Sequence, residues 1–194
     1  MPLLDTLTRA LDAQDPDATE HASRVASLAE IVARRLGWRE QSLEPLRLGG
    51  ALHDLGKLAV PRQLLLKRTA LTAAELARIR EHPSAGARLL APIAPVRPAL
   101  PYVLFHHERW DGGGYPTGRA GAQIPIGARV LAVVDAFDAM TSDRPYRRAL
   151  PVEAAIDEVN RCAGGQFDPV VARVFVGAWM KGEINLPERR AAVA

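Results

Sequence analysis

The sequence has only one cysteine, Cys162, and aromatic residues make up 5% of its 194 residues. A single cysteine excludes an internal disulfide and fits a reducing compartment. With so few aromatic side chains, aliphatic residues must fill the core. The chain also lacks a long hydrophobic run, because its most apolar stretch, residues 130–134, is ended by Asp135 and is too short to cross a bilayer. Since residues 1–15 also lack the pattern of a signal peptide, we expect a cytoplasmic protein with no membrane partner.

Neither positive nor negative charge is in large excess. The formal net charge is +3, and charged residues make up 24% of the chain. This mild basic bias favours an anionic ligand, but it is too small and too scattered to indicate duplex nucleic acid as a partner. The apolar fraction of 48% is that of an ordinary globular protein, and the length suffices for one domain with a substantial core.

Helical periodicity and capping signals recur along the chain. Asp15-Pro16 predicts a helix start with Asp15 as the N-cap, and Gly37 ends that helix. A second helix is expected from Ser42 to Leu55, with Gly56 as its C-terminal cap. Thr72 and Glu75 form a capping box that opens a helix ending near His82. Further helices are expected over residues 84–91, 102–105, 126–141, 151–162 and 169–180, the last opened by Asp168-Pro169.

Strand-like alternation of useful length does not occur in the sequence. The predicted fold class is therefore all-α, a compact bundle of about seven helices with a glycine-rich loop. We expect residues 1–14 to form an N-terminal helical extension, residues 15–182 to form one domain, and residues 183–194 to form a flexible tail.

The histidines carry the strongest functional signal. The chain has five of them, each beside an acid, a proline turn or another histidine: His21, His53, His82, His106 and His107. Imidazole is the commonest metal-binding side chain, and Asp54 and Asp135 add oxygen ligands. Plainer interpretations remain for single features. Asp17 and His21, four residues apart, can form a solvated helix face, Asp54 can be neutralised by Lys57, and Asp135 can be a buried, hydrogen-bonded acid.

Together these residues predict a metal site of nitrogen and carboxylate ligands, which suits Fe, Mn, Ni or Zn. The absence of cysteine ligands disfavours a structural zinc site, and the number of ligands favours two ions. Paired ions polarise a phosphoryl oxygen and generate a hydroxide for in-line attack, so a phosphodiester is the natural substrate. Arg144 and Arg147 are expected to meet its phosphates, because guanidinium groups match phosphate geometry.

The chain resembles the HD-GYP domains, a branch of the HD superfamily of metal-dependent phosphohydrolases. The sequence His53-Asp54-Leu55-Gly56-Lys57 matches the HD signature, and His106-His107-Glu108 through Gly114-Tyr115-Pro116 matches the GYP signature. Further matching segments follow in order: residues 124–125, 135–142, 144–147 and 167–169. The resemblance covers about residues 15–180.

The resemblance implies a helical bundle that hydrolyses cyclic di-GMP to the linear dinucleotide and in some members on to GMP. It implies two or three divalent ions, with Fe or Mn first and Ni or Zn as alternatives. The ligands by matched position would be His21, His53, Asp54, His82, His106, His107 and Asp135. Asp54 and Lys57 would be the catalytic residues, with Lys57 near the leaving oxygen or a phosphate. The nucleotide site would be lined by Tyr115, Asp138, Arg144 and Arg147.

One departure from the family concerns Asp17. The family usually has tyrosine at this position, but some members carry a carboxylate and bind a third metal. Asp17 is therefore a candidate ligand of a third ion. The alternative is that it is an ordinary acid in the first turn of a helix, which the helix dipole favours.

Other functions stay open at this point. The same metals could act on another cyclic dinucleotide, such as a mixed cyclic GMP-AMP. A weak enzyme could instead serve as a sensor, or dock through the loop of residues 112–121 onto a cyclic di-GMP synthase. The retention of all recognisable metal positions favours the enzyme. A homodimer also stays open.

Overall fold

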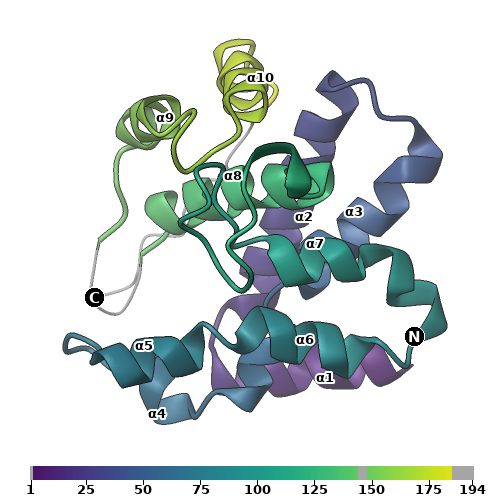
Figure 1. Cartoon of the computed structure of the whole chain (residues 1–194), viewed down its shortest axis with the longest axis vertical. Coiled ribbons are helices and arrows are strands. Elements are labelled where there is room, and N and C mark those ends of the chain that lie inside the picture. Colours follow the sequence, from purple (N-terminus) through teal and green to yellow (C-terminus); the bar gives the residue numbers. More distant parts are fainter. Residues whose placement is uncertain (1, 144–147, 185–194) are drawn as a thin grey trace.

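The computed structural model describes residues 2–143 and 148–184, and the described residues form helices, turns and loops (Figure 1). The α-helices are α1 (Pro2–Gln14), α2 (Ala18–Arg35), α3 (Glu40–Leu52), α4 (Arg62–Leu65), α5 (Ala73–Ile79), α6 (His82–Leu90), α7 (Leu100–Phe105), α8 (Ile126–Thr141), α9 (Val152–Arg161) and α10 (Pro169–Met180). Three 3₁₀ helices are η1 (Leu55–Ala59), η2 (Ala94–Ala99) and η3 (Gly121–Gln123). Within the described ranges no strand forms, apart from an isolated bridge between Ala163 and Phe167.

The predicted all-α bundle is confirmed. Seven of these α-helices have at least nine residues, while α4, α5 and α7 are shorter. The best predicted helix is α8, whose bounds agree with the expected residues 126–141. Asp168 caps α10 by accepting hydrogen bonds from the backbone N–H groups of Val170 and Val171, and Thr72 and Glu75 form the capping box of α5. The starts of these helices are predictable because each capping side chain lies within three residues of the backbone N–H group that it binds.

Two predicted helix ends are wrong. Helix α2 begins at Ala18, not after Asp15, because Asp17 turns the chain in a left-handed conformation with φ of 71°. The Asp15 carboxylate accepts a hydrogen bond from Lys57 instead of capping the helix. Helix α3 begins at Glu40 and ends at Leu52, so Gly56 is not its cap.

Gly56 has a different function, close packing between η1 and α6. A Cβ atom at this position would lie only 1.8 Å from the carbonyl oxygen of His82, so a side chain cannot be accommodated. The sequence predicts a helix cap at this glycine, whereas in the structure it allows two backbone segments to approach each other closely. This approach brings His82 next to the segment that carries His53 and Asp54.

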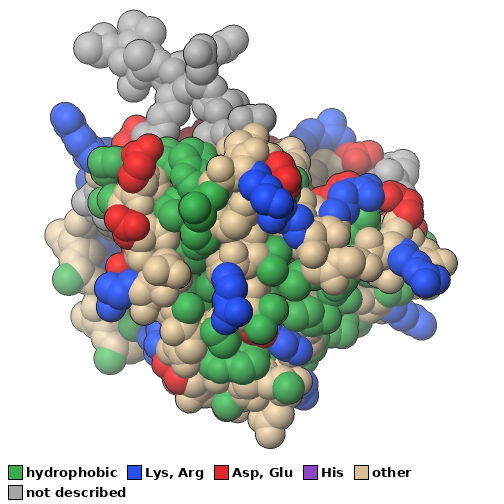
Figure 2. Space-filling model, turned by 90° about the horizontal axis from the view of Figure 1, so that it is seen from above, with side chains coloured by type: hydrophobic (Ala, Val, Ile, Leu, Met, Phe, Trp, Pro, Cys, Tyr) green, Lys and Arg blue, Asp and Glu red, His purple; other side chains and the backbone are tan. Residues whose placement is uncertain are grey.

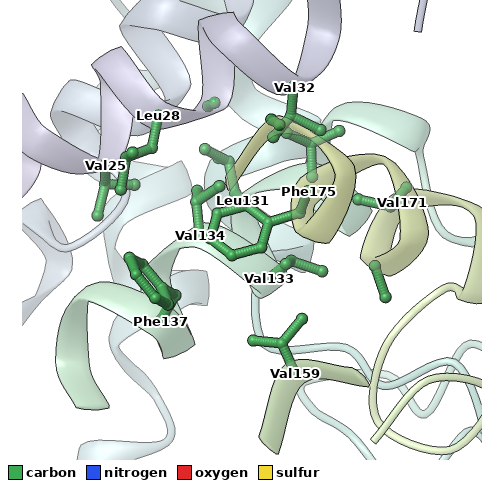
Figure 3. Packing of buried hydrophobic residues seen from close by; sticks show 14 of the residues in the cluster. Val25, Leu28, Val32, Leu131, Val133, Val134, Phe137, Val159, Val171 and Phe175 are labelled. Carbon is green, nitrogen blue, oxygen red and sulfur yellow. The ribbon is translucent and has the colours of Figure 1, made fainter. Parts of the chain in front are cut away.

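The main hydrophobic cluster lies where α2, α8, α9 and α10 meet (Figure 3). Helix α8 lies at its centre, and the rings of Phe137 and Phe175 meet there at 4.8 Å and 62°. Burying each such side chain stabilises the fold by roughly 1.5–3 kcal/mol. A second cluster includes residues from α1, α3, η1, α6 and α7. The histidines come from helices of both clusters, so the packing of the two clusters positions them relative to one another.

The two ends of the described chain are anchored to the bundle. Leu11 of α1 is buried in the second cluster, while Arg35 pairs with Glu183 and Ile184 is buried in the main cluster. Of the predicted tail, residues 185–194 lie outside the described residues. The division of the chain at residues 15 and 183 stays a prediction.

None of the described helices combines the length and the apolar character needed to cross a membrane. The face shown in Figure 2 mixes hydrophobic side chains with scattered charges of both signs, and no histidine is visible on it. This agrees with the burial of His21, His53, His82 and His106.

Candidate metal centre

The His53–Asp54 pair lies at the sharp turn between α3 and η1. His53 follows the last residue of α3, and Asp54 precedes the first residue of η1. Both side chains are buried and directed to the same interior site, where the rings of His21 and His106 lie 5.3 and 5.0 Å from the ring of His53. The predicted position at a helix end is correct, and the turn brings the imidazole and the carboxylate together.

Three of the histidines are oriented by the same local contact. The Nδ1 atoms of His53, His82 and His106 lie 2.7–2.8 Å from the carbonyl oxygens of Gly50, Ile79 and Val103. In each case the acceptor is three residues earlier in the chain. Such a contact places the ring hydrogen on Nδ1 and leaves the lone pair of Nε2 free for a metal ion.

The free nitrogens of these rings lie close together. The Nε2 atoms of His82 and His106 are 3.3 Å apart, although the Nδ1 contacts place the ring hydrogens on the far side of both rings. The Nε2 atom of His53 is buried and has no hydrogen-bond partner among the described residues. An unpaired buried nitrogen is costly, and two facing lone pairs repel each other, so a bound cation would relieve both.

Burial favours the neutral form of His53, His106 and His107. It lowers the pKa of His53 and His106, and it lowers the pKa of His107 to about 4. Neutral imidazole is the form that binds metal, so these rings need not lose a proton at neutral pH to act as ligands.

Asp54 faces two groups of histidines at once. Its Oδ1 lies 3.2 Å from His82 Nε2, and its Oδ2 lies 3.5 Å from His53 Nε2 and 3.9 Å from His21 Nε2. Burial raises the pKa of Asp54, but the nearby Lys57 ammonium and the imidazoles outweigh it and hold the pKa well below its usual value. The carboxylate is therefore ionised and is shared by both groups.

Two overlapping sets of candidate ligands follow from these positions. In each set the ligand atoms lie within 4.8 Å of one another. The histidine-rich group consists of Asp54, His82, His106 and His107. The second set consists of His21, His53 and Asp54. Asp135 also faces the second set, since its Oδ1 lies 3.2 Å from His21 Nε2 and 3.8 Å from His53 Nε2, and we call these four residues the acidic group.

His21 is oriented by a side chain instead of a carbonyl. Its Nδ1 lies 2.7 Å from Oδ2 of Asp138, and Arg24 donates to both oxygens of the same carboxylate at 2.6 and 3.0 Å. Burial lowers the pKa of His21, but hydrogen bonds with Asp135 and Asp138 outweigh it and raise the pKa to about 9. Asp138 was predicted to line the nucleotide site. Asp138 does border the cavity, but its side chain is only 1% exposed and contacts His21, a position that favours orientation of the imidazole.

Lys57 is held by two carboxylates. Its Nζ atom donates to Asp54 at 2.8 Å and to Asp15 at 3.0 Å. Burial lowers the pKa of Lys57, but the two acids outweigh it and raise the pKa above its usual value. The side chain of Gln14 donates to the backbone carbonyls of Lys57 and Val60, which fixes η1 against the end of α1. Lys57 is thus a fixed cation beside the acidic group.

The glycine-rich loop brings Tyr115 over His107. The two rings are stacked with centroids 4.8 Å apart, and Glu108 Oε1 accepts hydrogen bonds from the backbone N–H and the hydroxyl of Thr117. Gly114 allows the loop to fold back, since a Cβ atom there would lie 2.3 Å from the backbone nitrogen of Arg109. The predicted proximity of Tyr115 to the site is therefore seen in the structure.

A cavity of about 750 Å³ opens beside these groups. Its wall includes Lys57, His107, Tyr115 and Asp135, together with the segment of residues 64–71. Asp17 also lines the cavity, but it is exposed and belongs to neither ligand group. The predicted phosphate-binding residues Arg144 and Arg147 lie outside the described residues.

The HD domain family matches residues 5–171. The chain belongs to the HD domain family. This assignment confirms the resemblance found in the sequence. It also agrees with the geometry, because the buried His–Asp pair after which the family is named lies at the centre of the ligand groups.

Similar proteins include cyclic dinucleotide phosphodiesterases. A protein of Thermotoga maritima named cyclic di-GMP phosphodiesterase is 35% identical over 90% of this chain and 48% of its own length. A Vibrio cholerae protein named 3'3'-cGAMP-specific phosphodiesterase 3 is 34% identical over 83% of this chain and 35% of its own length. The chain thus spans half or less of the length of these curated relatives.

A solved structure has the same fold. An HD-GYP-type protein of Bdellovibrio bacteriovorus, Bd1817, superposes with a TM-score of 0.68 over 84% of this chain and 52% of that protein, at 20% identity. At this identity the likeness concerns the fold alone.

Several residues that position the ligands or line the cavity of this HD domain were not predicted from the sequence. Arg24 and Asp15 hold other functional side chains, and the segment of residues 64–71 lines the cavity. Arg24 could have been noticed, because it lies three residues after His21 on the same helix face. Its partner Asp138 and the contact of Asp15 with Lys57 are distant in sequence, and no local pattern indicates them.

Proposed function

We propose that this HD domain is a metal-dependent phosphodiesterase that hydrolyses cyclic di-GMP to the linear dinucleotide, and further to GMP. The observation that carries the proposal is the pair of ligand groups that share Asp54 beside a cavity of about 750 Å³. The names of similar proteins support the substrate class.

The metal ligands we propose are the residues of the two groups. They are His21, His53, Asp54, His82, His106, His107 and Asp135. Divalent ions bound there would supply polarisation of a phosphoryl oxygen and a water of lowered pKa. The mixed nitrogen and oxygen donors suit Fe or Mn, with Ni and Zn as alternatives. Asp17 is proposed as a ligand of a third ion.

Lys57 is proposed to act on the substrate. Its ammonium group carries a proton, lies in the cavity wall and is fixed by Asp15 and Asp54. It can donate a hydrogen bond to a phosphate oxygen or stabilise the leaving oxygen as negative charge develops there. Because it is already positioned, little reorganisation is needed when the substrate binds.

The remaining cavity residues are proposed to hold the nucleotide. Tyr115 presents an aromatic ring beside His107, and Arg144 and Arg147 are proposed to meet phosphates. For Asp138 the proposal changes from substrate contact to orientation of His21, because it is buried behind that ring.

The test combines metal analysis with product analysis. Protein prepared without oxygen is stripped with a chelator and reloaded with Fe(II), Mn(II), Ni(II) or Zn(II), and cyclic di-GMP hydrolysis is followed by chromatography. We expect Fe or Mn to restore hydrolysis, with the linear dinucleotide formed first. Full metal loading and tight substrate binding without hydrolysis would favour a sensor module over an enzyme.

A second candidate function is hydrolysis of mixed cyclic GMP-AMP. It is favoured by the 34% identity with the cGAMP-specific phosphodiesterase of Vibrio cholerae. Assaying cyclic di-GMP and 3'3'-cGAMP side by side distinguishes the two. Docking of a cyclic di-GMP synthase on the loop of residues 112–121, and a homodimer, stay predictions.

A further inference from the structure

One side of the cavity is lined by residues that are not candidate metal ligands. The segment of residues 64–71, which joins α4 to α5, lines it continuously. Leu64, Leu65, Leu66 and Leu71 of this segment line the cavity together with Ile79 of α5. Leu71 is exposed and the other four are only partly buried, so they offer an apolar surface to a ligand. Such a surface suits the flat face of a nucleobase better than a phosphate.

Four described Lys and Arg side chains line this cavity, and three of them are already paired. Arg24 binds Asp138, Lys57 binds Asp15 and Asp54, and Lys67 binds Glu75. The fourth cation is Arg68, which is exposed and has no hydrogen bond or ion pair with any described residue. Among the described Lys and Arg side chains of the wall, Arg68 is therefore the one without a carboxylate partner.

The segment that carries Arg68 is anchored at both ends by one carboxylate. Glu75 accepts two hydrogen bonds from Lys67 Nζ, at 2.7 and 2.8 Å, on the N-terminal side of Arg68. The same carboxylate accepts from the backbone N–H of Thr72, at 2.8 Å, on the C-terminal side. Residues 68–71 thus form a short loop between two anchored positions, which limits the backbone freedom that is lost when Arg68 binds a ligand.

We propose that Arg68 and the leucine wall of residues 64–71 recognise a guanine base, and that Arg68 makes the enzyme prefer guanine to adenine. This inference rests on the proposed cyclic dinucleotide substrate. A guanidinium group can donate two hydrogen bonds to O6 and N7 of guanine. Adenine has an amino donor where guanine has O6, so the same pair of bonds cannot form. The leucine side chains would contact the face of the base.

The alternative is that Arg68 binds a phosphate of the same ligand instead of a base. A phosphate contact would not distinguish guanine from adenine, so it predicts the same loss of affinity for all cyclic dinucleotides. A base contact predicts a loss for ligands that contain guanine and little or no loss for cyclic di-AMP. The two alternatives are therefore separated by one comparison of substrates.

The test uses Arg68→Met, which keeps an apolar stem and removes the donors, and Arg62→Ala as the matched control. Arg62 is an exposed arginine of α4, six residues away, and it does not line the cavity. For each metal-loaded protein, kcat/KM and Kd are measured with cyclic di-GMP, 3'3'-cGAMP and cyclic di-AMP. Bis(4-nitrophenyl) phosphate, which has no base, reports on the metal centre alone.

We expect Arg68→Met to reduce the preference for cyclic di-GMP over cyclic di-AMP by roughly 10- to 100-fold, because a good bidentate contact discriminates bases by about this factor. The mixed dinucleotide should lose about as much as cyclic di-GMP, because it can present its one guanine to Arg68, and the Arg62 variant should show no loss. Hydrolysis of bis(4-nitrophenyl) phosphate should be unchanged. An equal loss for all three dinucleotides, or no loss, overturns the proposal.

The binding measurement separates this proposal from the proposed function. A guanine preference in Kd that is lost in Arg68→Met, without turnover of any dinucleotide, supports base recognition and refutes the enzymatic function. Turnover of cyclic di-GMP with no base preference in the unaltered protein supports the enzyme and refutes the assignment of Arg68. Failure of the protein to bind any guanine dinucleotide refutes both.

Discussion

The two ligand groups that share Asp54 are built in different ways. In the histidine-rich group, His82 and His106 are oriented by backbone carbonyls, and burial keeps the pKa of His106 and His107 low. In the acidic group, His21 is oriented by a carboxylate, and its pKa is raised to about 9. The acidic group also has one backbone contact of this kind, from His53 to Gly50, but it adds a network of charged side chains around His21 that the histidine-rich group lacks.

This difference has a chemical consequence. The acidic group has Asp54, Asp135 and, behind His21, Asp138, so it concentrates negative charge that a hard cation would compensate. The histidine-rich group offers three imidazole nitrogens and one shared oxygen. We expect the two groups to differ in metal affinity and in their sensitivity to mutation of surrounding residues, and the following experiments address that difference.

The largest effect is expected from Asp54→Ala, because this residue belongs to both groups. The variant should lose metal from both and reduce turnover by more than the roughly 10- to 100-fold typical of residues that only orient a ligand. Metal content and turnover are measured on the same preparation, with circular dichroism as the control for folding. Retention of a full complement of metal would contradict the shared role.

Lys57→Ala should reduce turnover by roughly 10²- to 10⁴-fold, the range for a lost proton donor, with little change in metal content. Lys57 contacts the Oδ2 atom of Asp54, on the side of the acidic group, but is not itself a ligand. Metal analysis and steady-state kinetics distinguish the two effects. Loss of metal together with unfolding would show that Lys57 is a structural partner of Asp54.

His106→Ala and His21→Ala compare the groups directly. Each variant should lose the ion held by its own group and retain the other, because each of these two histidines belongs to a single group. The measurement is metal stoichiometry during titration with Mn(II). If both variants lose all metal, the two groups act as a single cooperative site and the distinction between them fails.

Arg24→Met should weaken metal binding in the acidic group only, by roughly 10- to 100-fold, since Arg24 holds the carboxylate that orients His21. Arg24→Lys, which keeps the charge, should recover part of this loss. Arg34→Met on the same helix is the control, because Arg34 is exposed and pairs with Glu30 and Glu40 instead. Equal weakening of both groups would mean that Arg24 acts through general stability.

The smallest effect is expected from Asp17→Asn. If Asp17 holds a third ion, the metal count should fall by one equivalent while the two main groups stay loaded. Its exposed position beside the cavity makes such an ion weakly held, so the titration must extend to high metal concentration. An unchanged count assigns Asp17 to the turn before α2, where its left-handed backbone already gives it a structural role.

Two Asp-Pro pairs show what the sequence can and cannot reveal. At Asp168-Pro169 the aspartate caps α10, as predicted, because its targets are the next backbone N–H groups. At Asp15-Pro16 the same dipeptide fails to start a helix, since Asp15 instead binds Lys57, which is 42 residues away. Helix α8 was predicted well from its own periodicity, whereas the Asp15–Lys57 contact depends on how separate helices pack.

The candidate site shows the same limit. The types of ligand residue and their convergence followed from the motifs, because histidine and aspartate in that pattern have few other uses. The hydrogen bonds that orient these side chains could not be predicted from the motifs. The carbonyl three residues before a histidine becomes an acceptor only when the ring turns inward, and Asp138 reaches His21 only because α2 packs on α8.

The candidate ligands come from five separate parts of the chain: the start of α2, the turn after α3, the start of α6, the end of α7 and the middle of α8. An unfolded chain cannot present them together, so metal would bind the native state almost exclusively. By mass action, the midpoint of thermal denaturation should then rise with the concentration of free metal and fall when a chelator is added. Conformational stability and metal supply would be thermodynamically linked in this protein.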